Sequence, residues 1–162
     1  MEPSEALSTA AQVAVALAGF AGVVVAFRSG SVHEWSKIDK FRLQLLLTNS
    51  AIPLTLCMVG QLLLAANIAP AAIWRWGSGF AALLLFPMAT VYLRTFRSFS
   101  PAELESAGRS TSIFYAGAAI GSVVTVLQLF NVAMLNAFWP FFLAIVSLVL
   151  ASLVQFIRLV LI

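Results

Sequence analysis

Long apolar segments separated by short polar ones dominate the pattern of residues along this chain. Five segments are almost entirely apolar over 18 or more residues, at about 7–27, 42–66, 72–94, 111–135 and 138–158. About 20 helical residues cross the roughly 30 Å hydrocarbon core of a bilayer. We therefore predict five transmembrane segments.

Inside a membrane, the hydrogen-bonding needs of the protein backbone restrict the structures that these segments can adopt. Backbone N–H and C=O groups in hydrocarbon must be hydrogen-bonded within the protein, which restricts spanning structures to helices and closed barrels. The segments are too long for barrel strands and show no alternation of polarity. The predicted fold class is all-α, an integral membrane bundle of five helices in one transmembrane domain, residues 1–162.

Two helix start signals lie in the polar segments. Ser36 followed by Asp39 can cap the second helix. Ser100 followed directly by a proline and then by Glu103 is a stronger signal, because proline fits the first turn of a helix. It predicts a short interfacial helix at about 101–108.

The distribution of basic residues predicts the orientation. With five spans, one side of the membrane receives eight of the nine Lys and Arg residues: Arg28, Lys37, Lys40, Arg42, Arg94, Arg97, Arg109 and Arg158. The other side receives only Arg75. Because basic residues are retained on the cytoplasmic side, we predict the N-terminus outside and the C-terminus inside.

Composition agrees with a membrane protein. The chain is 62% hydrophobic and 9% charged, against about 25% charged residues in soluble domains. Its net charge of +3 is scattered between apolar segments, which favours topology signals over a nucleic-acid-binding face. We expect no nucleic-acid partner.

Candidate catalytic groups are few. His33 is the only histidine, and the six acidic residues lie at or outside the predicted interfaces. Cys57 is the only cysteine, which excludes a disulfide within the chain and a cysteine-based metal site. We therefore expect no enzyme activity, metal or cofactor. A lipid enzyme using His33, Glu34 and Asp39 is a remote alternative.

One polar cluster interrupts the second apolar segment. Pro53 cannot donate a hydrogen bond to the carbonyl of Asn49, which lies among three consecutive polar side chains. Two interpretations are open: local repair of a kink, or a site for water, a cation or a polar ligand at the break Thr48–Pro53. The polar intramembrane cluster consists of Gln44, Thr48, Asn49, Ser50 and Thr55. Three of these residues, Gln44, Thr48 and Thr55, form a polar stripe on one helix face, which should face protein or water.

Other polar and small residues favour contacts between helices. Carboxamides inside predicted spans bond across helices more often than they bind ligands, and this applies to Gln12, Gln61, Gln128 and Asn131. The first helix carries a ridge of small residues at four-residue intervals, a helix-packing ridge of Ala14, Ala18, Gly22 and Ala26. The ridge can pack within the chain, in a homo-oligomer or on a partner subunit.

Membrane lipids are an expected partner. Basic side chains at the predicted inner surface can attract anionic headgroups at about 1 kcal/mol each. The predicted anionic-lipid contacts are Lys37, Lys40, Arg42, Arg94 and Arg97.

The stretch from Val13 to Val25, with Arg28, Trp35 and a leucine-rich second span, resembles small uncharacterised bacterial multi-spanning inner-membrane proteins. The resemblance covers the first third of the chain. It implies a multi-pass location in the prokaryotic inner membrane and no activity.

Two functional hypotheses follow from these observations. In the first, the chain is an accessory or scaffold subunit of a membrane assembly, because no ionisable residue falls at mid-membrane. In the second, it is an oligomeric channel or small-solute permeation protein that uses the polar break Thr48–Pro53. The partners are then other membrane-protein subunits or further copies of the chain.

Overall fold

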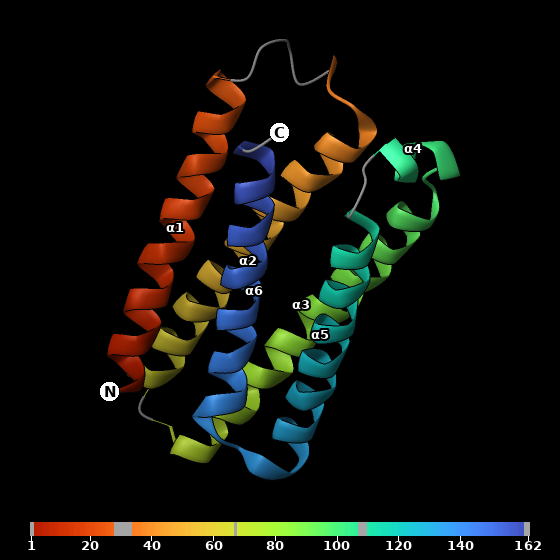
Figure 1. Ribbon diagram of the computed structural model, residues 1–162. Coiled ribbons are helices and arrows are strands. Elements are labelled where there is room, and N and C mark those ends of the chain that lie inside the picture. Colours follow the sequence, from red (N-terminus) through yellow and green to blue (C-terminus); the bar gives the residue numbers. More distant parts are fainter. Residues whose placement is uncertain (1, 28–33, 67, 107–109, 161–162) are drawn as a thin grey trace. The chain divides into compact units, whose positions relative to one another are not determined.

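The structure is a computed structural model that describes residues 2–27, 34–66, 68–106 and 110–160 (Figure 1). Five of its helices are long and apolar enough to cross a membrane, and the described residues contain no strand. The predicted all-α fold class with five membrane-spanning helices is therefore confirmed. The helices are α1 (Pro3–Phe27), α2 (Lys37–Ala65), α3 (Pro70–Arg97), α4 (Pro101–Ser106), α5 (Ser110–Phe130) with its π-helical continuation η2 (Asn131–Leu135), and α6 (Phe138–Val160).

The helices extend beyond the apolar segments where polar residues can cap them. α2 begins five residues before the predicted residue 42, because the Ser36 hydroxyl accepts a hydrogen bond from Asp39 N–H at 3.1 Å. α4 begins at the predicted proline with a reciprocal capping box. Ser100 N–H donates to Glu103 Oε2 at 2.7 Å, and Glu103 N–H donates to Ser100 Oγ at 3.3 Å. Both predicted start signals are confirmed.

The chain divides into two compact units. Unit 1 contains Met1–Asn67 and Ile145–Ile162, and unit 2 contains Ile68–Ala144. The first two turns of α6 therefore belong to unit 2, and the rest of α6 belongs to unit 1. The expectation of one transmembrane domain over residues 1–162 remains a prediction.

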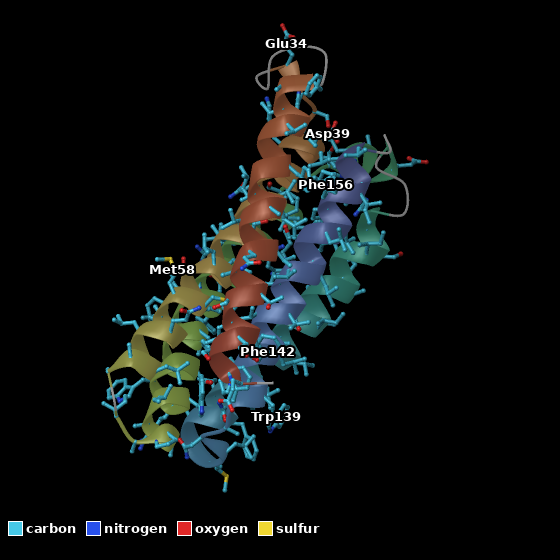
Figure 2. All side chains as sticks on the ribbon, turned by 90° about the vertical axis from the view of Figure 1, so that its left-hand side faces the viewer. Glu34, Asp39, Met58, Trp139, Phe142 and Phe156 are labelled. Carbon is cyan, nitrogen blue, oxygen red and sulfur yellow. The ribbon has the colours of Figure 1, made fainter. Side chains whose placement is uncertain are left out.

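Unit 1 consists of α1, α2 and most of α6. The end of α1, the start of α2 and the end of α6 lie at the same end of this unit (Figure 1). Phe156 of α6 lies next to α1, with its ring centroid 5.5 Å from that of Phe20 (Figure 2). The core at this end is formed by Ala21, Trp35, Leu43, Leu46 and Leu159, with Val24, Val25 and Phe156 packed against it.

Unit 2 pairs α3 with α5 and η2, which lie side by side (Figure 1). Aromatic contacts lie near both ends of α3. Near its start, the Trp74 ring contacts Phe138 and Phe141 of α6 at centroid distances of 4.7 and 6.0 Å. Near its end, Phe96 stacks on Phe114 of α5 at 3.7 Å.

Candidate functional site

The predicted polar cluster on α2 points in several directions. Asn49 and Ser50 are buried, Thr48 is half-buried, and Gln44 and Thr55 are exposed. The Thr55 hydroxyl donates to the carbonyl of Ala51 in its own helix at 2.9 Å. Because successive helical residues are separated by about 100°, the consecutive residues Thr48, Asn49 and Ser50 point in different directions. The cluster forms no single polar surface within the chain.

Ser50 has a contact that the sequence did not predict. Its hydroxyl forms a hydrogen bond with the hydroxyl of Ser152 on α6, and both side chains are fully buried. The carbonyl of Leu46 lies within reach of both hydroxyls, at 2.8 Å from Ser50 Oγ and 3.1 Å from Ser152 Oγ. These three groups join α2 to α6 inside unit 1.

The two hydroxyl protons cannot serve all three contacts. A helical carbonyl already accepts the N–H four residues later, so one lone pair of Leu46 O remains for a hydroxyl. One serine therefore donates to Leu46 O, and the other donates to the first serine. The serines can exchange these roles without any change in backbone position. The pair is a satisfied interhelical contact rather than an open ligand site.

A second polar contact joins α2 to α1. Gln61 Nε2 donates to Ser8 Oγ at 2.9 Å. This bond confirms the expectation that Gln61 bonds across helices.

Asn131 organises the turn between η2 and α6 in unit 2. Its Oδ1 accepts from Ala137 N–H at 2.9 Å, and its Nδ2 donates to Ala137 C=O at 3.0 Å. The same Nδ2 donates to Ser78 Oγ of α3 at 2.7 Å. Asn136 adopts the left-handed conformation (φ 48°) and donates its N–H to Asn131 C=O at 2.9 Å. Asparagine tolerates this conformation better than most residues.

Gln128 lies one turn before Asn131 and is also fully buried. Its Nε2 donates to the carbonyl of Pro140 in α6 at 2.8 Å. Gln128 and Asn131 therefore both bond across helices, as expected from the sequence. Gln12, the remaining carboxamide of that group, is exposed on α1.

The predicted packing ridge of α1 runs from the interior of unit 1 to its surface. Ala14 is buried, Ala18 is half-buried, and Gly22 and Ala26 are exposed. A spacing of four residues advances by about 40° per step around a helix with 3.6 residues per turn. The ridge therefore leaves the interface on which it begins.

The residues of two other stripes on α1 are spaced alternately by three and four positions. This spacing keeps each stripe on nearly the same face of the helix, unlike a constant spacing of four. The inner seam is buried or half-buried in unit 1, and it consists of Leu7, Ala10, Ala14, Leu17, Ala21 and Val24. The outer seam is exposed along its whole length, and it consists of Gln12, Val15, Gly19, Gly22 and Ala26. The two seams lie about 140° apart around the helix, because five residues separate their corresponding positions.

The outer seam has room for a closely packed neighbour. Apart from the helix itself, no atom lies within 4 Å of the position that a Cβ would take at Gly19 or Gly22. Gln12 makes no hydrogen bond with another described residue. The outer seam is therefore a smooth surface with one polar group, and no part of unit 1 covers it.

The basic residues expected to contact lipid lie in both units. In unit 2, Arg94 and Arg97 are exposed in the last turn of α3. In unit 1, Lys37 and Lys40 are exposed, whereas Arg42 is buried and forms an ion pair with Asp39 at 3.1 Å. Arg28 and Arg109 lie outside the described residues.

The structure brings no group of three or more described His, Cys, Asp and Glu residues together for a metal ion. Of the residues considered for lipid chemistry, Glu34 is exposed and Asp39 is bound to Arg42, while His33 lies outside the described residues.

Comparison of the chain with protein-family models, curated proteins and solved structures gives no match. The fold defines the class: a helical bundle with five helices long and apolar enough to cross a membrane.

Proposed function

We propose that this protein is an accessory or scaffold subunit of a membrane assembly, and that the outer seam of α1 binds a transmembrane helix of a different membrane protein. The observation that carries the proposal is the exposure of Gln12, Gly19 and Gly22 on one face of α1. The proposal assigns no enzyme activity.

The spacing of the outer seam supports a helix as the occupant. Residues separated alternately by three and four positions form the contact stripe of two helices that cross at a small angle. Lipid tails are as apolar as leucine, so close packing rather than hydrophobicity drives helix association in membranes. Small residues such as Gly19 and Gly22 permit that close packing.

The carboxamide of Gln12 supports a protein partner over lipid. Hydrocarbon offers no hydrogen-bond partner, so a polar side chain in a span is stabilised by a polar group on another helix. Such interhelical bonds contribute roughly 0.6 to 2 kcal/mol in membranes. Three carboxamides of the same expectation, Gln61, Gln128 and Asn131, already bond across helices within their units.

We also propose the orientation and location of the chain. The N-terminus lies outside and the C-terminus inside, since this arrangement places eight of the nine basic residues on the cytoplasmic side. The resemblance of the first third of the chain to bacterial proteins supports the prokaryotic inner membrane.

The test is native mass spectrometry of the protein extracted in mild detergent from its own membrane. We expect a heteromeric complex for the wild type, and loss of the partner in Gly22→Leu and Gln12→Leu. The matched control is Gly121→Leu on α5, another exposed glycine whose Cβ would meet open space. This control should retain the partner.

Two results would contradict the scaffold proposal: extraction of the wild type as a monomer, or equal retention of the partner by Gly22→Leu and the control. A side chain at position 22 should leave the fold of the chain intact, because no neighbouring atom would meet a Cβ at Gly22. Thermal unfolding of each variant checks this point directly.

The exposed side chains of Gln44 and Thr55 favour a second candidate function. An oligomer of this chain that lined a permeation path with α2 would give these polar groups water as a neighbour. Native mass spectrometry distinguishes this candidate as well, because it requires a homo-oligomer. Liposome flux that Gln44→Leu abolishes would then support a channel.

A further inference from the structure

We propose that unit 2 contacts bilayer lipid between two rims of exposed aromatic side chains, which lie at the headgroup levels of the two leaflets. One rim consists of Trp76 and Trp139, and the other rim is Tyr115. Among the described residues, these are the exposed tryptophan and tyrosine side chains, at 68%, 56% and 59% exposure. The inference concerns unit 2 and does not depend on the scaffold function proposed for the outer seam of α1.

The first rim lies where α3 and α6 begin, at the same end of unit 2 (Figure 1). The ring centroids of Trp74 and Phe138 are 4.7 Å apart, so these two residues lie at nearly the same level. Trp76 follows Trp74 by two positions, and Trp139 directly follows Phe138. At a rise of about 1.5 Å per residue, Trp76 and Trp139 therefore lie within about one helical turn of each other along the helix axes.

The second rim lies where α3 ends and α5 begins. The ring of Phe96 stacks on that of Phe114 at 3.7 Å, and it meets the ring of Tyr115 edge-on at 5.5 Å. Arg94 and Arg97 are exposed in the same last turn of α3. Tyrosine and arginine both combine an apolar body with a polar end, which suits the boundary between hydrocarbon and water.

The distance between the rims matches a bilayer. Trp76 and Phe96 are 20 positions apart in α3. This length of helix rises about 30 Å, which is the thickness of the hydrocarbon core. No charged residue occurs in α3 between Trp76 and Arg94, or anywhere in α5.

The surface between the rims is suited to acyl chains. Its large exposed side chains are apolar: Leu83, Phe86 and Val91 on α3, and Ile120, Val123, Val126 and Leu129 on α5. Three hydroxyls on these helices, those of Thr90, Ser122 and Thr125, donate to carbonyls of their own helix at 2.7 to 2.8 Å. A hydroxyl in hydrocarbon needs such a partner, because lipid tails offer none.

The placement of the amphipathic rings favours lipid over a protein as the neighbour of this surface. Tryptophan and tyrosine are enriched where an apolar ring can enter hydrocarbon while its N–H or O–H group reaches polar headgroups. A protein partner would not require these residues at two levels separated by the thickness of a bilayer.

The experiment measures tryptophan emission of the full-length protein in liposomes. Their phosphatidylcholine is brominated either near the carbonyl end or near the methyl end of the acyl chains, and bromine quenches a tryptophan that it contacts. The emission lost in Trp76→Phe and in Trp139→Phe gives the share of each ring. Leu83→Trp is the matched comparison, because position 83 lies on the same helix as Trp76, is also 68% exposed and should lie about 10 Å deeper.

We expect the lipid brominated near the carbonyl end to quench Trp76 and Trp139 more strongly than the other lipid does. The order should reverse for Leu83→Trp. Tyr115→Trp should behave as Trp76 does, and it provides a second measurement if a phenylalanine variant does not fold.

Three results would overturn the proposal. The first is stronger quenching of Trp76 and Trp139 by the lipid brominated near the methyl end. The second is a lack of quenching of both rings by either lipid, which would place the first rim in water or under protein. The third is protection of Leu83→Trp from both lipids, since a partner protein or a second copy of the chain would then cover the surface.

Discussion

The side-chain amide of Asn131 binds both backbone groups of Ala137, with Oδ1 2.9 Å from the N–H donor and Nδ2 3.0 Å from the C=O acceptor. Ala137 directly precedes α6, so this pair of bonds substitutes for the helical bonds that the chain lacks where η2 ends. Ser78 Oγ accepts a further bond from the same amide and connects the turn to α3. One side chain thus satisfies backbone groups that would otherwise need water.

Asn131→Leu should therefore be one of the most destabilising substitutions in unit 2. The change removes three hydrogen bonds and leaves the Ala137 N–H and C=O groups without these partners, which we expect to cost about 3 kcal/mol of unfolding free energy. The measurement is equilibrium unfolding in mixed micelles. Met134→Leu, an exposed substitution in the same π-helical segment, should change stability by less than about 0.5 kcal/mol. Similar stability of the two variants would contradict a structural role for Asn131.

The serine pair in unit 1 leads to a prediction about additivity. Two hydroxyl protons make two hydrogen bonds among Ser50, Ser152 and Leu46 O, and either serine alone can still donate to Leu46 O. Each single Ser→Ala change then loses one bond, and the double change loses two. We expect about 0.6 kcal/mol for each single variant and about twice that for the double variant.

A double-mutant cycle of unfolding free energies measures this directly. If all three contacts were full hydrogen bonds, each single variant would lose two of them, and the double variant would cost less than the sum of the singles. A coupling energy near one hydrogen bond would therefore contradict the proton count. A coupling energy near zero supports it.

The helices and their start signals were predictable from the sequence because they depend on local chemistry. Apolar length sets the spans, and Ser36 and Ser100 define helix starts through bonds to residues only three positions away. Carboxamides inside a span predict interhelical bonds, because hydrocarbon offers no other partner. This reasoning identified Gln61, Gln128 and Asn131 without their partners.

The partners and the directions of the helix faces required the structure. Ser152 lies in an apolar segment and has the same local signal as any serine that bonds to its own helix, so nothing marked it as the partner of Ser50. On α1, the four-residue spacing of the predicted ridge does not follow the exposed stripe around Gln12 and Gly19. Only the position of α2 shows which of the two α1 seams is covered.

Glycine substitutions test the packing of unit 2. A Cβ at Gly77 would lie 3.2 Å from the ring of Phe141, which is fully buried and in contact with Trp74. A Cβ at Gly117 of α5 would meet no atom within 4 Å. Alanine is favoured over glycine in a helix by about 1 kcal/mol. Gly117→Ala should therefore raise the unfolding free energy by about this amount, whereas Gly77→Ala should leave it unchanged or lower it. A clear stabilisation by Gly77→Ala would show that the Phe141 ring can move aside.

Single cysteines can test the proposed orientation in the native background. Cys57 is fully buried in α2, so the wild type should not react with a membrane-impermeant maleimide. Ser4 and Glu34 are exposed and lie just beyond opposite ends of the apolar stretch of α1. If basic residues keep the segment between α1 and α2 in the cytoplasm, Ser4→Cys should react in intact cells and Glu34→Cys only after permeabilisation. The reverse pattern would invert the proposed orientation. Reaction of both variants in intact cells would contradict a membrane-spanning α1, and the outer seam could then not bind a transmembrane helix.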